Sequence, residues 1–221
     1  MHTFKKAFTL AEVLITLLII GVIASIVIPG IINDTKDAEY NAGVKKAYAD
    51  LSAAVQMIQA NNGGSIAVGT GNTNADCTAF RNEFCNVMTC TKKDTEPNIF
   101  GVTMYKYYKS GDWQKFTWNS DLAATLNNGT LLSFNSWASC NNYGVNMCGY
   151  IWVDINGQKG PNMLGKDLYM FYVIRQNGTG PYSILPTGVS WDRGLSYPNY
   201  CTVGGGIGCA YKRLYDSENM P

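Results

Sequence analysis

The sequence predicts an α+β protein in which a long N-terminal helix packs on a C-terminal antiparallel β-sheet head with irregular, disulfide-stapled loops. Three observations lead to this fold class. Residues 13–32 form an uncharged apolar run, residues 44–58 carry apolar side chains at helical spacing, and short β-prone segments bounded by turn residues follow. All seven cysteines come after residue 76 and are the candidate staples.

The first element is the uncharged run Val13–Ile32, whose twenty residues are enough to cross a hydrocarbon core of roughly 30 Å as a helix. Lys5 and Lys6 precede the run, and Asp34 and Asp37 follow it. Because the basic flank of a membrane helix tends to stay in the cytoplasm, the rest of the chain is expected outside.

Two ordinary kinds of membrane segment explain this run incompletely. A secretory signal has an apolar core of only about 7–15 residues, followed by a small-residue cleavage site. A plain signal anchor accounts for the length and the orientation, but it leaves Glu12 at the start of the run and Pro29 within it unexplained.

The residues at positions 5–16, KKAFTLAEVLIT, resemble the processing site of type IV prepilins and type II secretion pseudopilins. In that family a membrane peptidase removes a short basic leader, and the new N-terminal aromatic residue is methylated. The resemblance implies a cut between Ala7 and Phe8 and N-methylation of Phe8. Ala7 stands where the family usually has Gly, so we expect slower cleavage.

The same resemblance assigns roles in assembly to three residues of the helix. Glu12, Gly21 and Pro29 are residues 5, 14 and 22 of the processed chain, where the family has these residue types. The family's glutamate guides assembly, and the region around its proline unwinds as the filament forms. An ordinary helix kink at Pro29 is an equal alternative, because proline removes one backbone hydrogen bond.

The role of Glu12 also has a physical argument. A charged side chain at the centre of a membrane helix costs roughly 2.5–3.5 kcal/mol on insertion scales. The candidate partner is the α-amine of Phe8, which is positive near neutral pH. The two groups can meet within one subunit or between staggered subunits, and the second arrangement makes Glu12 a determinant of assembly.

The resemblance therefore implies a pilin or pseudopilin, a subunit of a type IV pilus or of a type II secretion or competence filament. It divides the chain into a leader (1–7), a transmembrane and filament-core helix (8–32), an amphipathic continuation (33–62) and an extracytoplasmic head (63–221). The implied partners are other pilins, prepilin peptidase/methyltransferase, an inner-membrane assembly platform and lipid. The implied location is the inner membrane and then the pilus or pseudopilus.

The amino-acid composition argues against several other classes of function. A formal charge of +1 with no basic stripe argues against an obligatory nucleic-acid partner. The single histidine, His2, removes His-based zinc sites and Ser-His-Asp triads, so we expect neither an enzyme nor a cofactor. The alternative is a membrane-anchored binding module, a minor pilin or adhesin that recognises a surface, glycan or DNA. Its candidate aromatic face would use the five tryptophans, Trp113, Trp118, Trp137, Trp152 and Trp191.

After the apolar run the helix is predicted to continue to Ala60 and to end at the Asn-Asn-Gly-Gly sequence that follows. Its apolar stripe consists of Val44, Ala47, Tyr48, Leu51, Val55 and Ile58. Short helices are predicted over residues 77–90 and Ser120–Leu126, and the C-terminal end is predicted to be irregular. The predicted strands are Gly101–Tyr108, Gln114–Trp118, Thr130–Phe134, Tyr150–Ile155 and Leu168–Ile174.

Residues 153–173 resemble a segment of pilin-like heads, with a strand, an Asn-Gly turn, a Gly-Pro-Asn loop and a second strand. Asp154, Asn156, Asn162 and Asp167 bring oxygen atoms to this loop, which are the ligands that calcium prefers. The EF-hand pattern is absent, so a turn stabilised by Asn and Asp side chains is the favoured interpretation and calcium the weaker one.

The cysteines fall into three clusters, and a separation of eight residues recurs in each. We favour Cys140–Cys148 and Cys201–Cys209, since each closes a local loop and contributes roughly 2.5 kcal/mol on the chain-entropy estimate. The first cluster leaves three pairings open, 77–85, 77–90 and 85–90, and reduced thiols are the alternative. The candidates are Cys77, Cys85, Cys90, Cys140, Cys148, Cys201 and Cys209.

Overall fold

The computed structural model describes residues 9–68, 74–94, 104–106, 113–115, 122–136, 140, 146–157, 159–188, 201, 206 and 208–215. The chain divides into two compact units, Met1–Glu39 and Tyr40–Pro221. The first unit contains the apolar part of helix α1, and the second contains the rest of α1 and the sheet.

Helix α1 (Leu10–Asn61) is one unbroken helix of 52 residues with Pro29 inside it. It ends at the predicted place, where Gly63 and Gly64 have positive φ angles that glycine tolerates best. Within the second unit its predicted apolar stripe is confirmed. Its buried members are Val44, Leu51, Val55 and Ile58, and Ala47 and Tyr48 pack beside them. Tyr40 and Ala54 are also buried on this part of the helix, although the predicted stripe did not include them.

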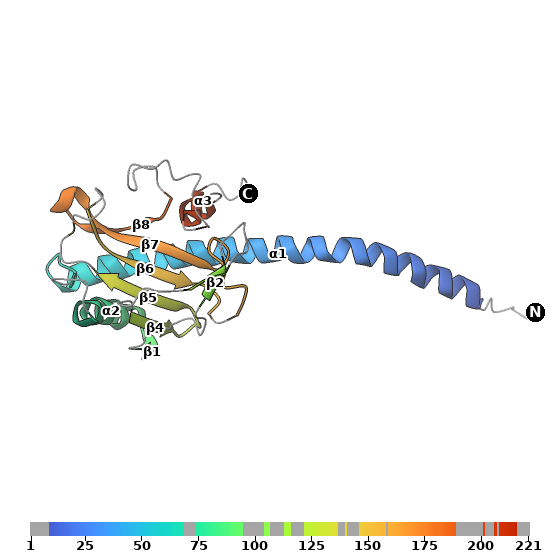
Figure 1. The fold of residues 1–221 in the computed structure, drawn as a ribbon, viewed down its shortest axis with the longest axis horizontal. Coiled ribbons are helices and arrows are strands. Elements are labelled where there is room, and N and C mark those ends of the chain that lie inside the picture. Colours follow the sequence, from blue (N-terminus) through green and yellow to red (C-terminus); the bar gives the residue numbers. More distant parts are fainter. Residues whose placement is uncertain are drawn as a thin grey trace, which may run out of the picture. The chain divides into compact units, whose positions relative to one another are not determined.

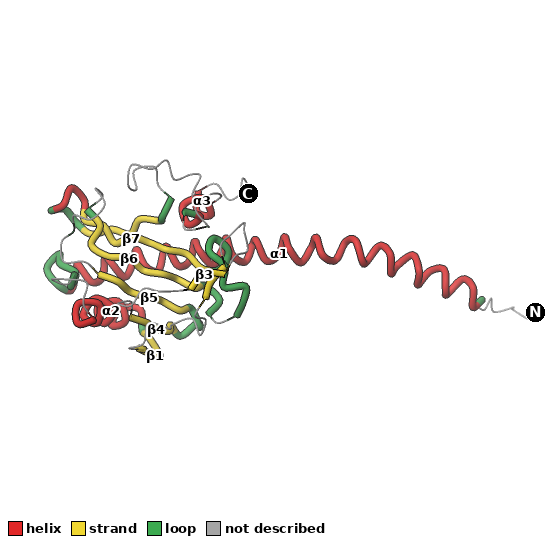
Figure 2. The backbone as a smooth tube through the Cα atoms, in the orientation of Figure 1, coloured by secondary structure: helices red, strands yellow, loops and turns green. Residues whose placement is uncertain are grey.

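The head is built on a six-stranded antiparallel sheet, in the order β1-β4-β5-β6-β7-β8 (Figure 1). A separate antiparallel pair joins β2 and β3 (Figure 2). The strands are β1 (Cys90–Asp94), β2 (Met104–Lys106), β3 (Trp113–Lys115), β4 (Leu122–Leu126), β5 (Leu131–Ser136), β6 (Met147–Asp154), β7 (Leu168–Arg175) and β8 (Tyr182–Pro186).

The second part of α1 and helix α2 (Asn74–Met88) cover one face of this sheet (Figure 1). Their core combines Leu51 and Ile58 of α1 with an aromatic group in which Phe80, Phe84 and Phe134 have ring centroids 5.1–6.1 Å apart. A second buried cluster is formed by the side chains on the opposite face of the sheet. It includes Ala123, Leu131, Met147, Tyr150, Trp152, Leu168, Met170 and Tyr172.

The short C-terminal helix α3 (Cys209–Tyr215) is fastened to the head through the buried side chain of Arg213. Its Nε donates to the carbonyl oxygen of Gly165 at 3.1 Å, and its Nη1 donates to Oδ1 of Asn41 at 2.9 Å. A 3-10 turn, η1 (Gln176–Gly178), connects β7 to β8. The end of the chain therefore contains an ordered helix, where the sequence predicted irregular structure.

The predicted helix Ser120–Leu126 is wrong, because Leu122–Leu126 forms strand β4. The alanine-rich sequence favours helix locally. In the fold, Gly129 has a φ angle of 86° and completes a turn that pairs β4 with β5. Ala123 and Ala124 then face opposite buried sides of the sheet, so tertiary packing overrides local preference.

The structure contains strands that overlap the other predicted strands, with different ends. Strand β2 lies within the first predicted strand, and β3 overlaps the second at residues 114–115. The predicted strands Thr130–Phe134, Tyr150–Ile155 and Leu168–Ile174 correspond to β5, β6 and β7. Strands β1 and β8, at the two edges of the sheet, were not predicted.

Candidate functional site

The functional segment that the sequence singles out is the start of α1, where Thr9 caps the helix. The backbone N–H and hydroxyl of Thr9 donate to Oε2 of Glu12 at 2.8 and 2.9 Å, and the Glu12 N–H donates to the Thr9 hydroxyl at 3.2 Å. This reciprocal arrangement is a capping box, with the pattern Thr-x-x-Glu. The Thr-x-x-Glu pattern is visible in the sequence, and the capping role of Thr9 was not among the predictions.

The predicted partner of Glu12 is not tested by this geometry. Ala7 and Phe8, the residues of the predicted cut, lie outside the described residues. The carboxylate of Glu12 already has hydrogen-bond donors within its own chain. An interaction with the α-amine of Phe8 would therefore compete with the cap or add to it.

The apolar part of α1 exposes its large side chains all around the helix. Leu10, Leu18 and Ile26 are 80%, 67% and 73% exposed. The helix passes the length and hydropathy test for a membrane span, with an 18-residue window of mean hydropathy 2.8 that has no residue buried inside the protein. In water such a surface would be costly, because each exposed aliphatic side chain forgoes roughly 1.5–3 kcal/mol of burial free energy.

The polar side chains of this part are satisfied by the helix itself. The hydroxyls of Thr16, Ser25 and Thr35 donate to backbone carbonyls three or four residues earlier, at 2.7–2.9 Å. A helix in lipid needs its polar groups satisfied internally. The segment meets this requirement for these hydroxyls without any neighbour.

Gly21 and Pro29, the other two predicted assembly residues, both lie inside α1. A Cβ atom added at Gly21 would meet nothing within 4 Å, and the same is true at Gly30. The helix continues through Pro29 without a break, so the predicted soft point is not an interruption of α1 in this state.

The second candidate site is the loop between β6 and β7, where Asp154 ends one strand and Asp167 directly precedes the next. The N–H of Ile155 donates to the Asp167 carbonyl oxygen at 2.9 Å, which closes the hairpin behind the loop. The Asp167 carboxylate accepts the N–H groups of Asn162 and Met163 at 2.8 and 2.6 Å. The structure thus brings the predicted oxygen-bearing residues together.

Both carboxyls of this loop are buried, with Asp154 1% exposed and Asp167 fully covered. Burial first, and then the nearby charge of Asp167, raise the pKa of Asp154 to about 8, although the N–H groups of Asn156 and Gly157 oppose the shift. Burial also raises the pKa of Asp167, although several N–H donors oppose the shift. Negative charge in this loop is therefore poorly compensated by the protein.

Three disulfides staple the head. Cys140 pairs with Cys148 and Cys201 with Cys209, which are the two pairs that the spacing favoured. In the first cluster Cys85 at the end of α2 pairs with Cys90 at the start of β1. Cys77 remains a buried thiol and accepts a hydrogen bond from the Ser136 hydroxyl.

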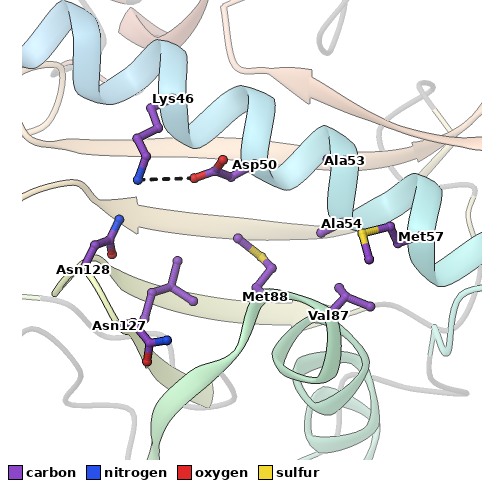
Figure 3. Close-up of a pocket in the computed structure, with 10 residues that line it drawn as sticks. Lys46, Asp50, Ala53, Ala54, Met57, Val87, Met88, Asn127 and Asn128 are labelled. Carbon is purple, nitrogen blue, oxygen red and sulfur yellow. Dashed lines mark ion pairs between the residues drawn. The ribbon is translucent and has the colours of Figure 1, made fainter.

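A groove of about 360 Å³ lies between α1, the end of α2 and the turn after β4 (Figure 3). Its charged side chains are Lys46 and Asp50, which form an ion pair at 3.7 Å one helical turn apart. The other lining residues are alanines, methionines, Val87, Leu126 and two asparagines. Such a pair on an exposed helix face is an ordinary surface interaction, and these residues contain no nucleophile with an adjacent base.

The predicted aromatic ligand face is not found where the structure allows a test. Trp152 is 2% exposed and its ring stands edge-on to Tyr150, with centroids 6.4 Å apart, inside the second core cluster. Trp118, Trp137 and Trp191 lie outside the described residues, and Trp113 is described only as part of β3.

Comparison with protein families identifies the N-terminal segment. Residues 3–28 match the model of the prokaryotic N-terminal methylation motif, the motif of type IV pilins and pseudopilins. The match covers the predicted cleavage site, the capping box and most of the apolar run. The chain carries this motif, and the proteins that the motif defines are structural subunits. No curated protein and no solved structure matches the chain.

Residues 22–150 also match the model of a glucanosyltransferase family. This stretch begins inside the exposed apolar run and ends within β6. Glycosyl transfer with retention uses two carboxyl groups about 5–5.5 Å apart. Among the described residues of the stretch, Asp50 is paired with Lys46, and Glu83 accepts hydrogen bonds from Asn62 and Ala67. The buried carboxyl pair, Asp154 and Asp167, lies outside the matched stretch.

Proposed function

We propose that this protein is a structural subunit, a pilin or pseudopilin, of a type IV pilus or of a type II secretion or competence filament. Prepilin peptidase cuts it between Ala7 and Phe8, the new N-terminus is methylated, and the subunit assembles through its N-terminal helix. The observation that carries the proposal is the methylation motif at the start of a helix whose large apolar side chains are exposed on all sides.

The exposed helix suits two environments in succession. Before assembly its apolar surface is covered by lipid, and afterwards by the same helices of neighbouring subunits. The exchange has no large hydrophobic driving force, because lipid tails are as apolar as leucine side chains. Close packing, polar interactions and work by an assembly platform must therefore supply the free energy.

Glu12 is the polar interaction that we assign to assembly. In the isolated chain its carboxylate accepts two hydrogen bonds from Thr9, which keeps it at the N-terminal end of the helix. Processing places a positive α-amine at Phe8, only one residue before that cap. A neighbouring subunit docked in register then offers a charged partner that exceeds what the neutral Thr9 donors provide.

Gly21 fits the same picture of packed helices. Its own chain leaves open space where a side chain would stand, so glycine is not required by the fold of the monomer. Small residues let membrane helices approach closely. We therefore place Gly21 at a contact with a neighbouring helix, and Pro29 with Gly30 at the point where the helix can unwind in the filament.

The orientation follows from two features on opposite sides of the apolar run. Lys5 and Lys6 precede it, and three disulfides lie in the head beyond it. Basic flanks tend to stay in the cytoplasm and disulfides persist outside it. The head then lies outside the inner membrane, and later in the pilus or pseudopilus, and the subunit itself performs no enzymatic reaction.

Intact-mass and N-terminal sequencing of the protein from native membranes tests the proposal. The expected species has lost Met1–Ala7 and begins with Phe8 carrying one methyl group. Changing Ala7 to a bulky residue serves as the control, because this substitution should leave the leader attached. A native chain that keeps Met1, or that is cut beyond the apolar run, would contradict the proposal and favour a plain anchor or a secretory signal.

A further inference from the structure

We propose that the head carries two complementary surfaces through which successive copies of this chain dock. One is an aromatic knob on α3, formed by Tyr211 and Tyr215, and the other is the methionine-lined groove beside α1, which receives the knob of a neighbouring copy. This inference rests on the proposed function, because it concerns contacts between subunits of a filament. It adds the surfaces that the heads use, beyond the contacts of the N-terminal helix.

The head leaves few large apolar side chains exposed to solvent. Among its described residues, from Tyr40 onwards, these are Met57 at 51%, Tyr211 at 38% and Tyr215 at 60% exposure. Single exposed apolar residues are ordinary on a protein surface, but these three fall into only two places. The two tyrosines form the knob, and Met57 lines the groove.

The knob is held on a rigid base. The rings of Tyr211 and Tyr215 have centroids 4.9 Å apart, and a side-chain hydrogen bond joins Tyr215 to Tyr48 of α1. The Tyr211 N–H donates to the carbonyl oxygen of Thr187 at 3.0 Å, and the buried Arg213 fastens α3 to the head. Side chains that are already fixed lose little entropy on binding, so the knob is preorganised for contact.

The groove has an apolar centre and a polar edge (Figure 3). Its volume is about 360 Å³, and Met57, Val87 and Met88 supply apolar surface to it. Methionine side chains adapt to the shape of a partner, and their sulfur atoms make favourable contacts with aromatic rings. An apolar centre with polar groups around it is the usual arrangement of a protein–protein contact. The polar edge is formed by Lys46, Asp50, Asn127 and Asn128.

The two surfaces lie on opposite flanks of the head (Figure 1). The groove runs beside the end of α2, and α2 packs on β4 and β5, whereas α3 packs on β7 towards the other edge of the sheet. A contact between unlike surfaces of two copies is heterologous. Each copy therefore keeps one surface available for the next, and the contacts continue along a filament unless the rotation between copies closes a ring.

The charges of the two surfaces also match. Helix α3 carries Lys212 and Arg213 and no acidic residue, and Lys212 stands between the two tyrosines in the sequence. At the groove the Asp50 side chain is 45% exposed and its carboxylate lies 3.7 Å from Nζ of Lys46, near the outer limit of an ion pair. A carboxylate in so loose a pair can accept a second cation, so we assign Lys212 of the docked copy to Asp50.

The area of this contact makes it weak between two isolated heads. An aromatic side chain buries about 150–250 Å², so two tyrosines bury about 300–500 Å². A stable interface buries about 800 Å² on each partner. The contact therefore forms where packed N-terminal helices already hold neighbouring heads at a high local concentration, and free monomers do not associate through it.

The competing explanation for the exposed tyrosines is a sugar-binding surface, since aromatic rings also stack on sugars. That explanation gives the groove around Met57 no role. The two explanations make different demands on the molecule, because docking between copies needs both surfaces and a sugar ligand needs only the tyrosines.

Disulfide crosslinking within assembled filaments of the full-length protein tests the contact. A chain with both Met57→Cys and Tyr215→Cys should give a ladder of covalent multimers under oxidising conditions, whereas each single substitution can give at most dimers. Gln56→Cys with Tyr215→Cys is the matched control, since Gln56 is an exposed neighbour of Met57 that does not line the groove, and it should give no ladder. Filaments in which the first pair gives no ladder, or in which both pairs give equal ladders, would overturn the proposal.

A second measurement does not depend on added cysteines. Lys212→Glu should lower the amount of sheared filament by about tenfold, which corresponds to 1.4 kcal/mol of docking free energy. Asp50→Lys in the same chain should restore the amount, because the reversed charges attract again. Lys159→Glu removes a positive charge at an exposed position outside both surfaces, so it is the control and should leave the amount unchanged.

Failure of this inference and failure of the proposed function give different results. If the native chain keeps Met1 and forms no filaments, the proposed function fails and the docking surfaces fail with it. If processed filaments form but the ladder and the charge rescue are both absent, the proposed function stands and only the knob and the groove are wrong. Normal filaments from Tyr215→Ala, together with lost binding to purified peptidoglycan, would assign the tyrosines to a sugar ligand instead.

Discussion

The two parts of helix α1 have the same secondary structure and opposite surroundings. Leu17 in the apolar part is 61% exposed, whereas Leu51 in the head is fully buried against the sheet. The first part carries apolar residues on every side, and the second concentrates them on one stripe. Helical geometry therefore says nothing about the partner of a helix, and the distribution of apolar residues around it does.

The comparison also shows how each part obtains its stability. The head buries its apolar side chains in its own core, which is formed by α1, α2 and the sheet. The apolar part has no such core, and its hydroxyls bond to its own backbone. Substitutions in the two parts should consequently affect different measurements, assembly for the first and unfolding for the second.

The largest effect is expected for Glu12→Val, which should abolish filaments while membrane insertion and the unfolding midpoint of the head stay unchanged. The variant removes the charge that we assign to docking between subunits and makes the span more apolar. Filaments sheared from cells and membrane fractions provide the two measurements. Normal filaments from this variant would remove Glu12 from the assembly mechanism.

Thr9→Ala separates the charge of Glu12 from its role in the helix cap. The alanine removes one of the two donors to the carboxylate, and losing a cap costs about 1 kcal/mol, but the carboxylate remains. Filaments should therefore persist in reduced amount. If Thr9→Ala abolished filaments as completely as Glu12→Val, the cap and not the charge would be responsible. Glu39→Val, an exposed position after the apolar run, is the control for loss of charge alone.

The next effect compares two leucines of the same helix. Leu51→Ala should lower the free energy of unfolding of the head by about 2–5 kcal/mol, because it removes a fully buried side chain and leaves a cavity. Leu17→Ala should change it by less than about 0.5 kcal/mol. Denaturant titration of the full-length protein in detergent measures both. Equal effects would mean that the apolar part shares a cooperative core with the head.

The smallest effect concerns the contact between α1 and the edge strand β8. Gln59 accepts the N–H of Tyr182 at 2.7 Å and donates to its carbonyl oxygen at 3.0 Å. Gln59→Ala should therefore cost about 1 kcal/mol, since it leaves two partly buried backbone groups of Tyr182 without this partner. The matched control is Gln56→Ala, a substitution at an exposed position of the same helix, which should leave the free energy of unfolding nearly unchanged. Hydrogen exchange at β8 should rise in the first variant and not in the second.

Features that depend on local pattern could be predicted from residue order. The length of α1, its change from an all-round apolar surface to a stripe, and its end at the glycines follow from residue order. The methylation motif was equally visible, because processing depends on a short contiguous segment. The strands β5, β6 and β7 were predicted from their β-branched and aromatic residues.

Pairing between distant segments could be read only from the folded head. Leu122–Leu126 became strand β4 because β1 and β5 flank it, against the helix preference of its alanines. The choice of Cys85–Cys90 over Cys77 depended on where α2 ends beside β1. The absence of a hydrogen-bond partner for the buried Oδ2 atom of Asp154, among the described residues, depended on which donors the folded loop brings within reach, since hydrogen bonding is a property of positions in space and spacing along a chain fixes those positions only within a single element.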